Sequence, residues 1–91
     1  MDFKKENNRI YLEDDKGDTL AEITFPFLDK DLVTINKTFV SPALRGQGMA
    51  GKLMQEAVDT IESKGWKAEA QCSYAKKWLE KHPEKNFLFI K

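Results

Sequence analysis

The segment Ser41–Lys52, which reads SPALRGQGMAGK, constrains the fold and the ligands of this chain more than any other. Its glycines predict a tight turn, and the residues after them predict an amphipathic helix that begins directly at the turn. The first N–H groups of a helix have no partner within it, and the helix dipole favours negative charge there. Arg45 adds a forked cation beside these N–H groups. The segment therefore predicts a site for a phosphate or a diphosphate.

Alternating apolar and polar side chains predict three strands upstream of this segment. The first two, Arg9–Asp14 and Thr19–Phe25, are separated by a turn in which Gly17 can adopt a positive φ. Asp31–Val40 is a longer strand. The apolar residues on one face of this third strand are Val33, Ile35 and Phe39. Because short connections join them, the three strands are expected to form an antiparallel meander.

The hydrophobic pattern changes from that of a strand to that of a helix after the glycine turn. Apolar residues recur at helical spacing over Gly48–Lys64, and Gly65 is placed to end this helix. Alternation resumes over Trp66–Cys72, which predicts a further strand. Since a strand–helix–strand crossover is right-handed, Trp66–Cys72 is expected to lie parallel to Asp31–Val40.

A second, short helix is expected after this strand. Ser73 is a candidate N-cap, and His82-Pro83 ends the helix because proline cannot continue it. Apolar residues over Asn86–Ile90 predict a final strand. The predicted order is three strands, then helix, strand, helix and strand, which is a mixed α/β (α+β) fold.

The size and the charge of the chain limit its classes of function. Its 91 residues fit one domain, 1–91, and 15 basic against 15 acidic residues give no net charge, which argues against broad attraction to nucleic acid or anionic membranes. No apolar segment resembles a transmembrane helix or a signal peptide, so a cytoplasmic protein is expected, and its size suggests a monomer. Cys72 is the only cysteine, which excludes an internal disulfide. Without a cluster of histidines and cysteines, no metal site is expected.

The glycines of the turn also match two nucleotide-binding patterns. They spell G-x-G-x-x-G, but Ser41 to Arg45 separate them from the preceding strand, and the acidic residue expected about 20 positions later would be Glu69, inside a strand. With Lys52 they spell G-x-x-x-x-G-K, but Leu53 follows where a hydroxyl should hold Mg²⁺. A dinucleotide site and a triphosphatase site fit the segment less well than a third alternative, a loop that holds the diphosphate of coenzyme A.

The stretch from Phe39 to Leu53 resembles the acetyl-CoA-binding motif of the GNAT N-acetyltransferases. The later stretch from Cys72 to Glu84, which reads CSYAKKWLEKHPE, is similar to that of short, single-domain GNAT-like proteins of bacteria, a group with a close relative in animals. The resemblance covers about residues 8 to 90. It implies the acyl-CoA N-acyltransferase fold.

In that fold, two parallel strands splay apart and the acyl-CoA lies between them. The resemblance implies that Asp31–Val40 and Trp66–Cys72 are these strands, with a β-bulge near the end of the first. The backbone near Phe39 and Val40 would pair with the pantetheine amides like an added strand. The residues expected to hold the diphosphate are Arg45, Gly46, Gln47, Gly48, Met49, Ala50 and Gly51.

The chain departs from the family pattern at several points. Ala43 replaces the usual glutamine or arginine, and the residues upstream of it predict strands rather than the N-terminal helices that shape the acceptor pocket of full-length relatives. Residues 34–38 contain no carboxylate to act as a general base, and Lys37 stands where short relatives often have histidine. Leu79 replaces the tyrosine that acts as general acid, which leaves Tyr74 as the substitute candidate.

Cys72 lies between the second splayed strand and the following helix, near the position that the resemblance implies for the thioester. A thiol at a helix N-terminus can become reactive. Cys72 therefore either takes the acetyl group transiently or lines the cleft as a small apolar residue, and both roles stay open. Lys76 and Lys77 would meet the outer phosphate or the adenine end of the acyl-CoA, or are solvated helix lysines. His82 is expected to stabilise a helix end.

The loop and the resemblance together predict a protein that binds acetyl-CoA and transfers its acetyl group to a primary amine. Binding geometry and backbone N–H groups that polarise the thioester carbonyl would supply much of the rate. The sequence does not identify the acceptor, which is a small molecule or a protein. The lack of an evident base and acid also fits a non-catalytic acyl-CoA-binding module or a subunit that needs a partner. A nucleotide-binding protein is the remaining alternative.

Overall fold

The computed structural model describes residues 3–90, which contain seven strands, two α-helices and two 3₁₀ turns. Four strands form one antiparallel sheet in the order β1-β2-β3-β6. They are β1 (Lys4–Glu6), β2 (Arg9–Glu13), β3 (Thr19–Thr24) and β6 (Lys37–Val40). The predicted hairpin of Arg9–Asp14 and Thr19–Phe25 is confirmed, and Gly17 has a φ of 85° in its turn.

The second sheet has the order β4-β5-β7. Its strands are β4 (Phe27–Asp29), β5 (Leu32–Ile35) and β7 (Lys67–Ala70). β4 is antiparallel to β5, whereas β7 is parallel to β5, with Val33 opposite Ala68 and Ile35 opposite Ala70. The parallel arrangement predicted for the segments Asp31–Val40 and Trp66–Cys72 is therefore confirmed.

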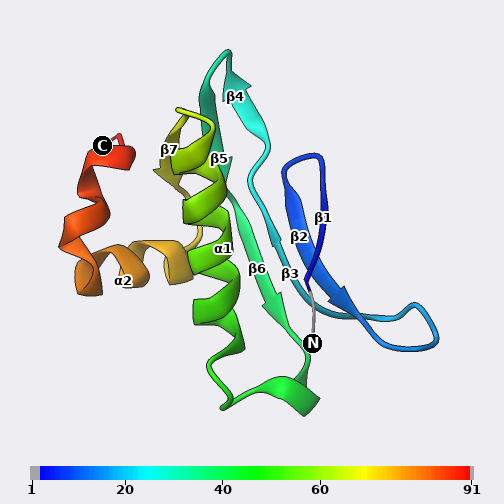
Figure 1. The fold of residues 1–91 in the computed structure, drawn as a ribbon. Helices are drawn as coiled ribbons and strands as arrows, with labels where there is room; N and C mark the ends of the chain where they lie inside the picture. The colour runs from blue at the N-terminus through cyan, green and yellow to red at the C-terminus, as the bar shows by residue number, and fades with distance from the viewer. Residues whose placement is uncertain (1–2, 91) are drawn as a thin grey trace.

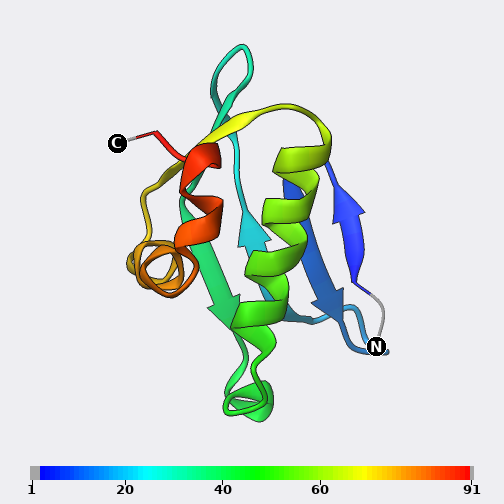
Figure 2. The same cartoon turned by 60° about the vertical axis from the view of Figure 1, so that its left-hand side comes forward.

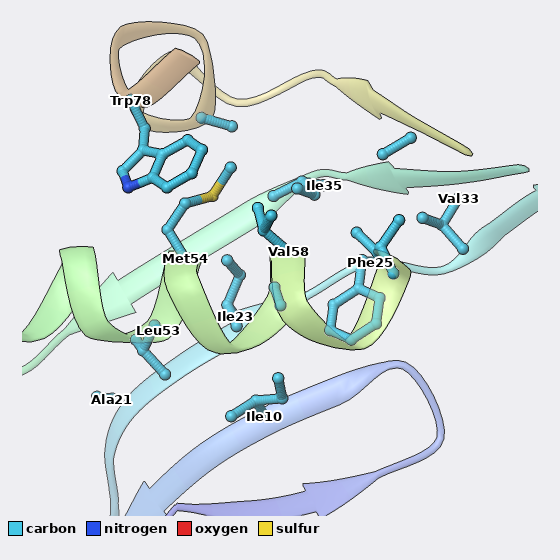
Figure 3. Close-up of a cluster of buried hydrophobic side chains, with 14 of the residues drawn as sticks. Ile10, Ala21, Ile23, Phe25, Val33, Ile35, Leu53, Met54, Val58 and Trp78 are labelled. Carbon is cyan, nitrogen blue, oxygen red and sulfur yellow. The ribbon is translucent and has the colours of Figure 1, made fainter. Parts of the chain in front are cut away.

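The helix α1 (Met49–Ser63) packs its apolar stripe against both sheets. Its buried residues are Met49, Leu53, Met54, Ala57, Val58 and Ile61. Figure 3 shows Leu53, Met54 and Val58 of this helix facing Ile23 and Ile35 from the strands. Trp78 of α2 (Ser73–Lys81) lies beside Met54 in the same view. Full burial of each large apolar side chain contributes ~1.5–3 kcal/mol, so this shared core holds the helix to the strands.

Both helices lie on one face of the strands, as Figures 1 and 2 show. Burial alternates along β2 and β3, where Ile10, Leu12, Ala21 and Ile23 are buried and their neighbours are partly exposed. This alternation is typical of a sheet with a single covered face. Within residues 3–90, no helix covers the opposite face.

The predicted long strand Asp31–Val40 is divided at Asn36. The Thr24 carbonyl accepts a hydrogen bond from the Asn36 N–H at 3.3 Å, and Thr24 is also the ladder partner of Lys37, so two residues oppose one. This β-bulge transfers the chain from one sheet to the other and reverses the inward and outward positions. The prediction that Phe39 shares a buried face with Val33 and Ile35 is therefore wrong, because Phe39 is 36% exposed.

Two other predictions near the C-terminus are wrong. The predicted strand Asn86–Ile90 is mostly the 3₁₀ turn η2 (Pro83–Leu88), followed by a single bridge between Phe89 and Ala68. Pro83 restricts the backbone φ at the start of this turn. Leu88 is buried in the core, whereas Phe87 is exposed, so the segment lacks the alternating burial of a strand. The N-cap of α2 is Cys72, and Ser73 is the first helical residue.

Strands β1 and β4 were not expected from the sequence. All three residues of each strand are exposed, so neither shows the alternation that marks a half-buried strand. Over residues 3–90, the structure contains no helix with the length and apolarity needed to cross a membrane.

Candidate functional site

The predicted anion loop joins β6 to α1 through the 3₁₀ turn η1 (Pro42–Leu44). Gly46 and Gly48 have φ values of 84° and 72°, a conformation that favours glycine. The first N–H bonded along α1 is that of Lys52, which donates to the Gly48 carbonyl at 3.1 Å. The N–H groups of residues 46–51 have no hydrogen-bond acceptor among the residues that the structure describes. The turn therefore presents a run of free donors at the positive end of the helix dipole.

A hollow of about 280 Å³ lies over this turn. Its lining residues are Val40, Leu44, Arg45, Gly46, Gly48, Met49, Ala50, Gly51 and Tyr74. Most of the residues predicted to bind the diphosphate are thus brought together around one space. A methyl group built on Gly51 would lie 3.5 Å from the Tyr74 hydroxyl, so the chain is close-packed at this point.

A second hollow, of about 480 Å³, adjoins the first and shares Gly48, Gly51 and Tyr74 with it. It continues along the groove between α1 and α2. The cations that line it are Lys52, Lys77 and Lys81. None of these lysines forms an ion pair with a carboxylate within residues 3–90. Three uncompensated ammonium groups beside the free N–H groups make this groove suitable for an anion.

Trp78 and His82 form the aromatic part of this groove. Their rings stack with centroids 3.9 Å apart and an interplanar angle of 14°. The Nδ1 of His82 is 2.9 Å from the Trp78 carbonyl oxygen, at the C-terminus of α2. His82 therefore closes a helix end, as predicted, and its ring also lines the groove.

The open edge of β6 borders the first hollow. β6 is the last strand of its sheet, and the Ser41 N–H donates to the Leu20 carbonyl at 2.7 Å. Hydrogen-bonded pairs alternate along an antiparallel ladder, so the backbone groups of Thr38 and Val40 point away from β3. The Arg45 Nε–H donates to the Val40 carbonyl at 3.3 Å from that side. Beyond this contact, the open edge offers backbone donors and acceptors to an extended ligand.

The two parallel strands separate at Ile35. Its carbonyl accepts hydrogen bonds from the N–H groups of Gln71 and Cys72, both at 3.1 Å. After this point, β6 pairs with β3, whereas the segment that leaves β7 continues into α2. The Thr38 hydroxyl oxygen and the Cys72 sulfur lie 3.6 Å apart across the start of the gap. The splayed arrangement expected from the sequence is thus present, with Cys72 at its narrow end.

The two candidate catalytic residues occupy different parts of the site. Cys72 is half-buried, and its sulfur accepts a hydrogen bond from the Ala75 N–H at 3.4 Å as the N-cap of α2. Tyr74 lies between the two hollows. Burial raises the pKa of the Tyr74 hydroxyl, so this group is protonated and can donate a proton at neutral pH.

Some predicted site residues lie outside both hollows. The side chain of Gln47 is exposed, as is that of Phe39, although the backbone around them borders the site. Lys77 lines the groove, whereas Lys76 does not. The sequence prediction missed Lys52 and Lys81 as groove residues. The four-residue spacing of Lys77 and Lys81 indicates that these two lysines share one helix face, but no sequence signal places that face, or Lys52, beside the groove.

Comparison with known proteins identifies the family. Residues 9–88 match the model of the GCN5-related N-acetyl-transferase family. A protein from Staphylococcus aureus, described as GCN5-like, has a solution structure that superposes with a TM-score of 0.80 and 36% identity. That match covers 98% of this chain and 87% of the other.

Two further proteins, one of known structure, are similar to parts of this chain. The N-acetyltransferase YhbS from Escherichia coli, crystallised in complex with CoA, is 25% identical, with a TM-score of 0.55 over 64% of this chain and 35% of that one. Protein NATD1 of Homo sapiens is 29% identical over 68 residues, which are 75% of this chain and 60% of that protein. The chain thus spans about three-fifths of the length of the curated relatives it matches. The chain belongs to the family of GCN5-related N-acetyltransferases.

Proposed function

We propose that this protein binds acetyl-CoA and transfers its acetyl group to a primary amine. The observation that carries the proposal is the run of N–H groups at residues 46–51, which have no acceptor within the described chain and adjoin the open edge of β6. A diphosphate and a peptide-like arm joined in one ligand match these two features together. Acetyl-CoA has both.

Each part of the ligand has a matching group in the site. The N–H groups of residues 46–51, with the Arg45 guanidinium, would hold the diphosphate. The free backbone groups of Thr38 and Val40 would pair with the pantetheine amides as an added strand does. Lys52, Lys77 and Lys81 would face the phosphorylated adenosine end. That YhbS was crystallised with CoA supports a ligand of this class.

The narrow end of the gap is where we place the chemistry. Cys72 and Thr38 lie there, and we propose that the Cys72 thiol lines the thioester pocket while the amine attacks directly. The sulfur already accepts the Ala75 N–H as a helix cap, which gives it a structural task. Tyr74, protonated at neutral pH, is our candidate donor of a proton to the CoA thiolate as the C–S bond breaks. The proton that the neutral amine loses as its nitrogen bonds to the acetyl carbon returns through solvent to the Tyr74 oxygen, so the tyrosine is restored. If the acetyl group instead passes through Cys72, mass spectrometry after mixing with acetyl-CoA will find it on that residue.

A transfer assay tests the proposal. The protein is incubated with acetyl-CoA and primary amines: a peptide with a free N-terminus, a lysine peptide and a polyamine. Thiol release and the mass of each amine are measured. We expect one class of amine to gain an acetyl group. Arg45→Ala should weaken CoA binding about 10- to 100-fold, because it removes a charged partner of phosphate.

The matched control is Lys30→Ala, which removes an exposed cation from the turn between β4 and β5. Its CoA affinity should equal that of the wild type. An Arg45→Ala protein that binds CoA as tightly as the Lys30→Ala protein would show that the diphosphate lies elsewhere.

One observation favours a second candidate function, a non-catalytic acyl-CoA-binding module or a subunit that acts with a partner. The segment from Leu32 to Val40, which forms one side of the gap, contains no aspartate, glutamate or histidine. This candidate predicts tight CoA binding with no acetylated amine in the same assay, or activity only after a second protein is added.

A further inference from the structure

The imidazole ring of His82 is held in one orientation at the wall of the groove between α1 and α2. Its Nδ1 lies 2.9 Å from the Trp78 carbonyl oxygen. A carbonyl oxygen only accepts hydrogen bonds, so Nδ1 carries the proton and donates it to this bond. The imidazole also stacks on the Trp78 indole, with ring centroids 3.9 Å apart and an interplanar angle of 14°. The hydrogen bond and the stack act on the same ring and together restrict its rotation.

Trp78 is itself fixed by the core. It is 6% exposed, and Figure 3 shows its indole beside Met54 of α1. Because Trp78 covers one face of the imidazole, His82 presents the other face and the ring edge to the groove that it lines. A flat surface that is already rigid loses little conformational entropy when a second flat ring stacks on it.

The charges around this ring suit a ligand that joins a flat ring to a phosphate. Lys52, Lys77 and Lys81 line the same groove. Within residues 3–90, no aspartate or glutamate is among the residues that line it. The groove therefore combines a rigid aromatic surface with three cations and without an opposing carboxylate.

The order of the lining residues matches the order of the parts of CoA. Gly51 and Tyr74 line both hollows, whereas His82 lines only the second. The diphosphate of CoA joins the pantetheine arm on one side to a 3′-phosphorylated adenosine on the other. With the diphosphate on the N–H groups of residues 46–51 and the arm along β6, the adenosine enters the part of the groove that His82 lines.

We infer that the imidazole of His82 is the platform on which the adenine base of CoA stacks, with the 3′-phosphate directed to the three lysines. This inference rests on the proposed binding of acetyl-CoA, because it assigns the nucleotide half of that ligand. Trp78, His82 and adenine then form a stack of three rings. The site also selects the acyl donor: it favours CoA thioesters over a phosphopantetheine arm attached to a carrier protein, which has no adenosine.

The first test is an NMR titration with adenosine 3′,5′-bisphosphate as the probe. His82 is the only histidine of the chain, so its ring protons are assigned directly. We expect them to move upfield in a saturable way, because the ring current of a stacked purine shields them. Inorganic diphosphate, an anion without a ring, should cause no upfield shift. The indole N–H of Trp66, which lines a different hollow, is the internal control and should keep its position.

Two outcomes of this titration would overturn the inference. The His82 ring protons could keep their positions while backbone amides along the groove shift, which would place the base elsewhere. They could also shift equally with both anions, which would show a response to charge alone. The titration uses the wild-type protein, so it does not depend on the folding of a variant.

Two variants of His82 separate its flat ring from its role at the helix end. His82→Ala removes the platform and should weaken CoA binding about tenfold, a loss typical of one stacked base. His82→Phe keeps a flat ring but removes Nδ1, and it should bind CoA nearly as tightly as the wild type. The affinity for 4′-phosphopantetheine should be the same in all three proteins. Equal losses of CoA affinity in the two variants, or an equal loss of both ligands in His82→Ala, would overturn the inference.

The inference and the proposed function fail in different ways. If CoA shifts the amides of residues 46–51 and leaves the His82 ring protons unshifted, the platform is wrong and the proposed function stands. If acetyl-CoA binds with its adenine on His82 but no amine gains an acetyl group, the proposed transfer alone is contradicted.

Discussion

The sulfur of Cys72 lies 3.6 Å from the hydroxyl oxygen of Thr38, a residue 34 positions earlier in the chain. This contact spans the gap between β6 and the chain that leaves β7. The contact lies immediately beyond Ile35, the last residue of β5 that is hydrogen-bonded to the chain leaving β7. A ligand that extends along the open edge of β6 would reach this pair at the end of its path.

Alkylation of Cys72 reports on that path. Cys72 is the only cysteine of the chain, so one iodoacetamide adduct is expected. Saturating CoA should slow the alkylation at least several-fold, because its pantetheine arm would cover the sulfur. The rate is followed by mass spectrometry of the intact protein, with ATP as the control nucleotide because it lacks the pantetheine arm. Equal protection by both nucleotides would show that the arm does not reach the gap.

Gly51→Ala should separate stability from binding. A methyl group at this position meets the Tyr74 hydroxyl at 3.5 Å, which is ordinary contact, and Gly51 lies in the first turn of α1 at a φ that alanine can adopt. Replacing a helical glycine by alanine stabilises a protein by about 0.5–1 kcal/mol. The added methyl group also narrows the hollow over the free N–H groups. Urea unfolding should therefore show a more stable protein, and calorimetry should show a weaker affinity for CoA. An affinity equal to that of the wild type would contradict a close approach of CoA to the helix backbone at Gly51.

Much of this architecture could be predicted because the local pattern and the tertiary fold agree. The glycine turn, the apolar stripe of α1 and the alternation of β2 and β3 each carry their own signal, and the crossover rule then places β7 beside β5. The resemblance implied a β-bulge in the strand Asp31–Val40, but its position at Asn36 could not be predicted from the hydrophobic pattern, because a bulge changes the inward and outward positions without changing composition. β1 and β4 were missed because they bury no side chain.

The site was predicted where it depends on the backbone and was missed where it depends on neighbours in space. Gly46, Gly48 and Gly51 mark the turn in the sequence. The lysine groove requires α2 to pack beside the N-terminal turns of α1, which no local pattern encodes. The same reason explains why Lys77, rather than Lys76, lines the groove: the direction of each side chain follows from how α2 docks.

The paired variants Lys77→Ala and Lys76→Ala test the groove. Lys77 lines it and its neighbour Lys76 does not, although both are exposed lysines of one helix. Lys77→Ala should lower the affinity for CoA about threefold to tenfold and reduce the preference for CoA over dephospho-CoA, because an outer phosphate loses a cation. Lys76→Ala should change neither quantity. Calorimetry at low and high salt measures both, and identical effects of the two variants would place the outer phosphate outside the groove.

The acid stability of the fold should depend on Glu22. Burial alone would raise the pKa of this carboxyl, but hydrogen bonds from Arg9 and Lys37 outweigh it and hold the pKa below its ordinary value of 4.5. A lowered pKa in the folded state stabilises the protein above pH 4.5, and this stabilisation is lost as the pH falls through the folded value.

Glu22→Gln should therefore cost about 1 kcal/mol at neutral pH and less at pH 3, and Glu80→Gln should cost little at either pH. Urea unfolding at the two pH values checks this. A penalty for Glu22→Gln that does not shrink with acid would show that packing, rather than the ion pairs, sets the contribution of Glu22.

The central claim is that the main-chain N–H groups of residues 46–51 hold the diphosphate of CoA. The most direct measurement is a titration of ¹⁵N-labelled protein with CoA, which observes those N–H groups individually. We predict that CoA at one equivalent shifts the amides of residues 46–51 most strongly, followed by Thr38 and Val40 on the open edge of β6. A saturating titration in which these amides keep their positions while others move would contradict the account.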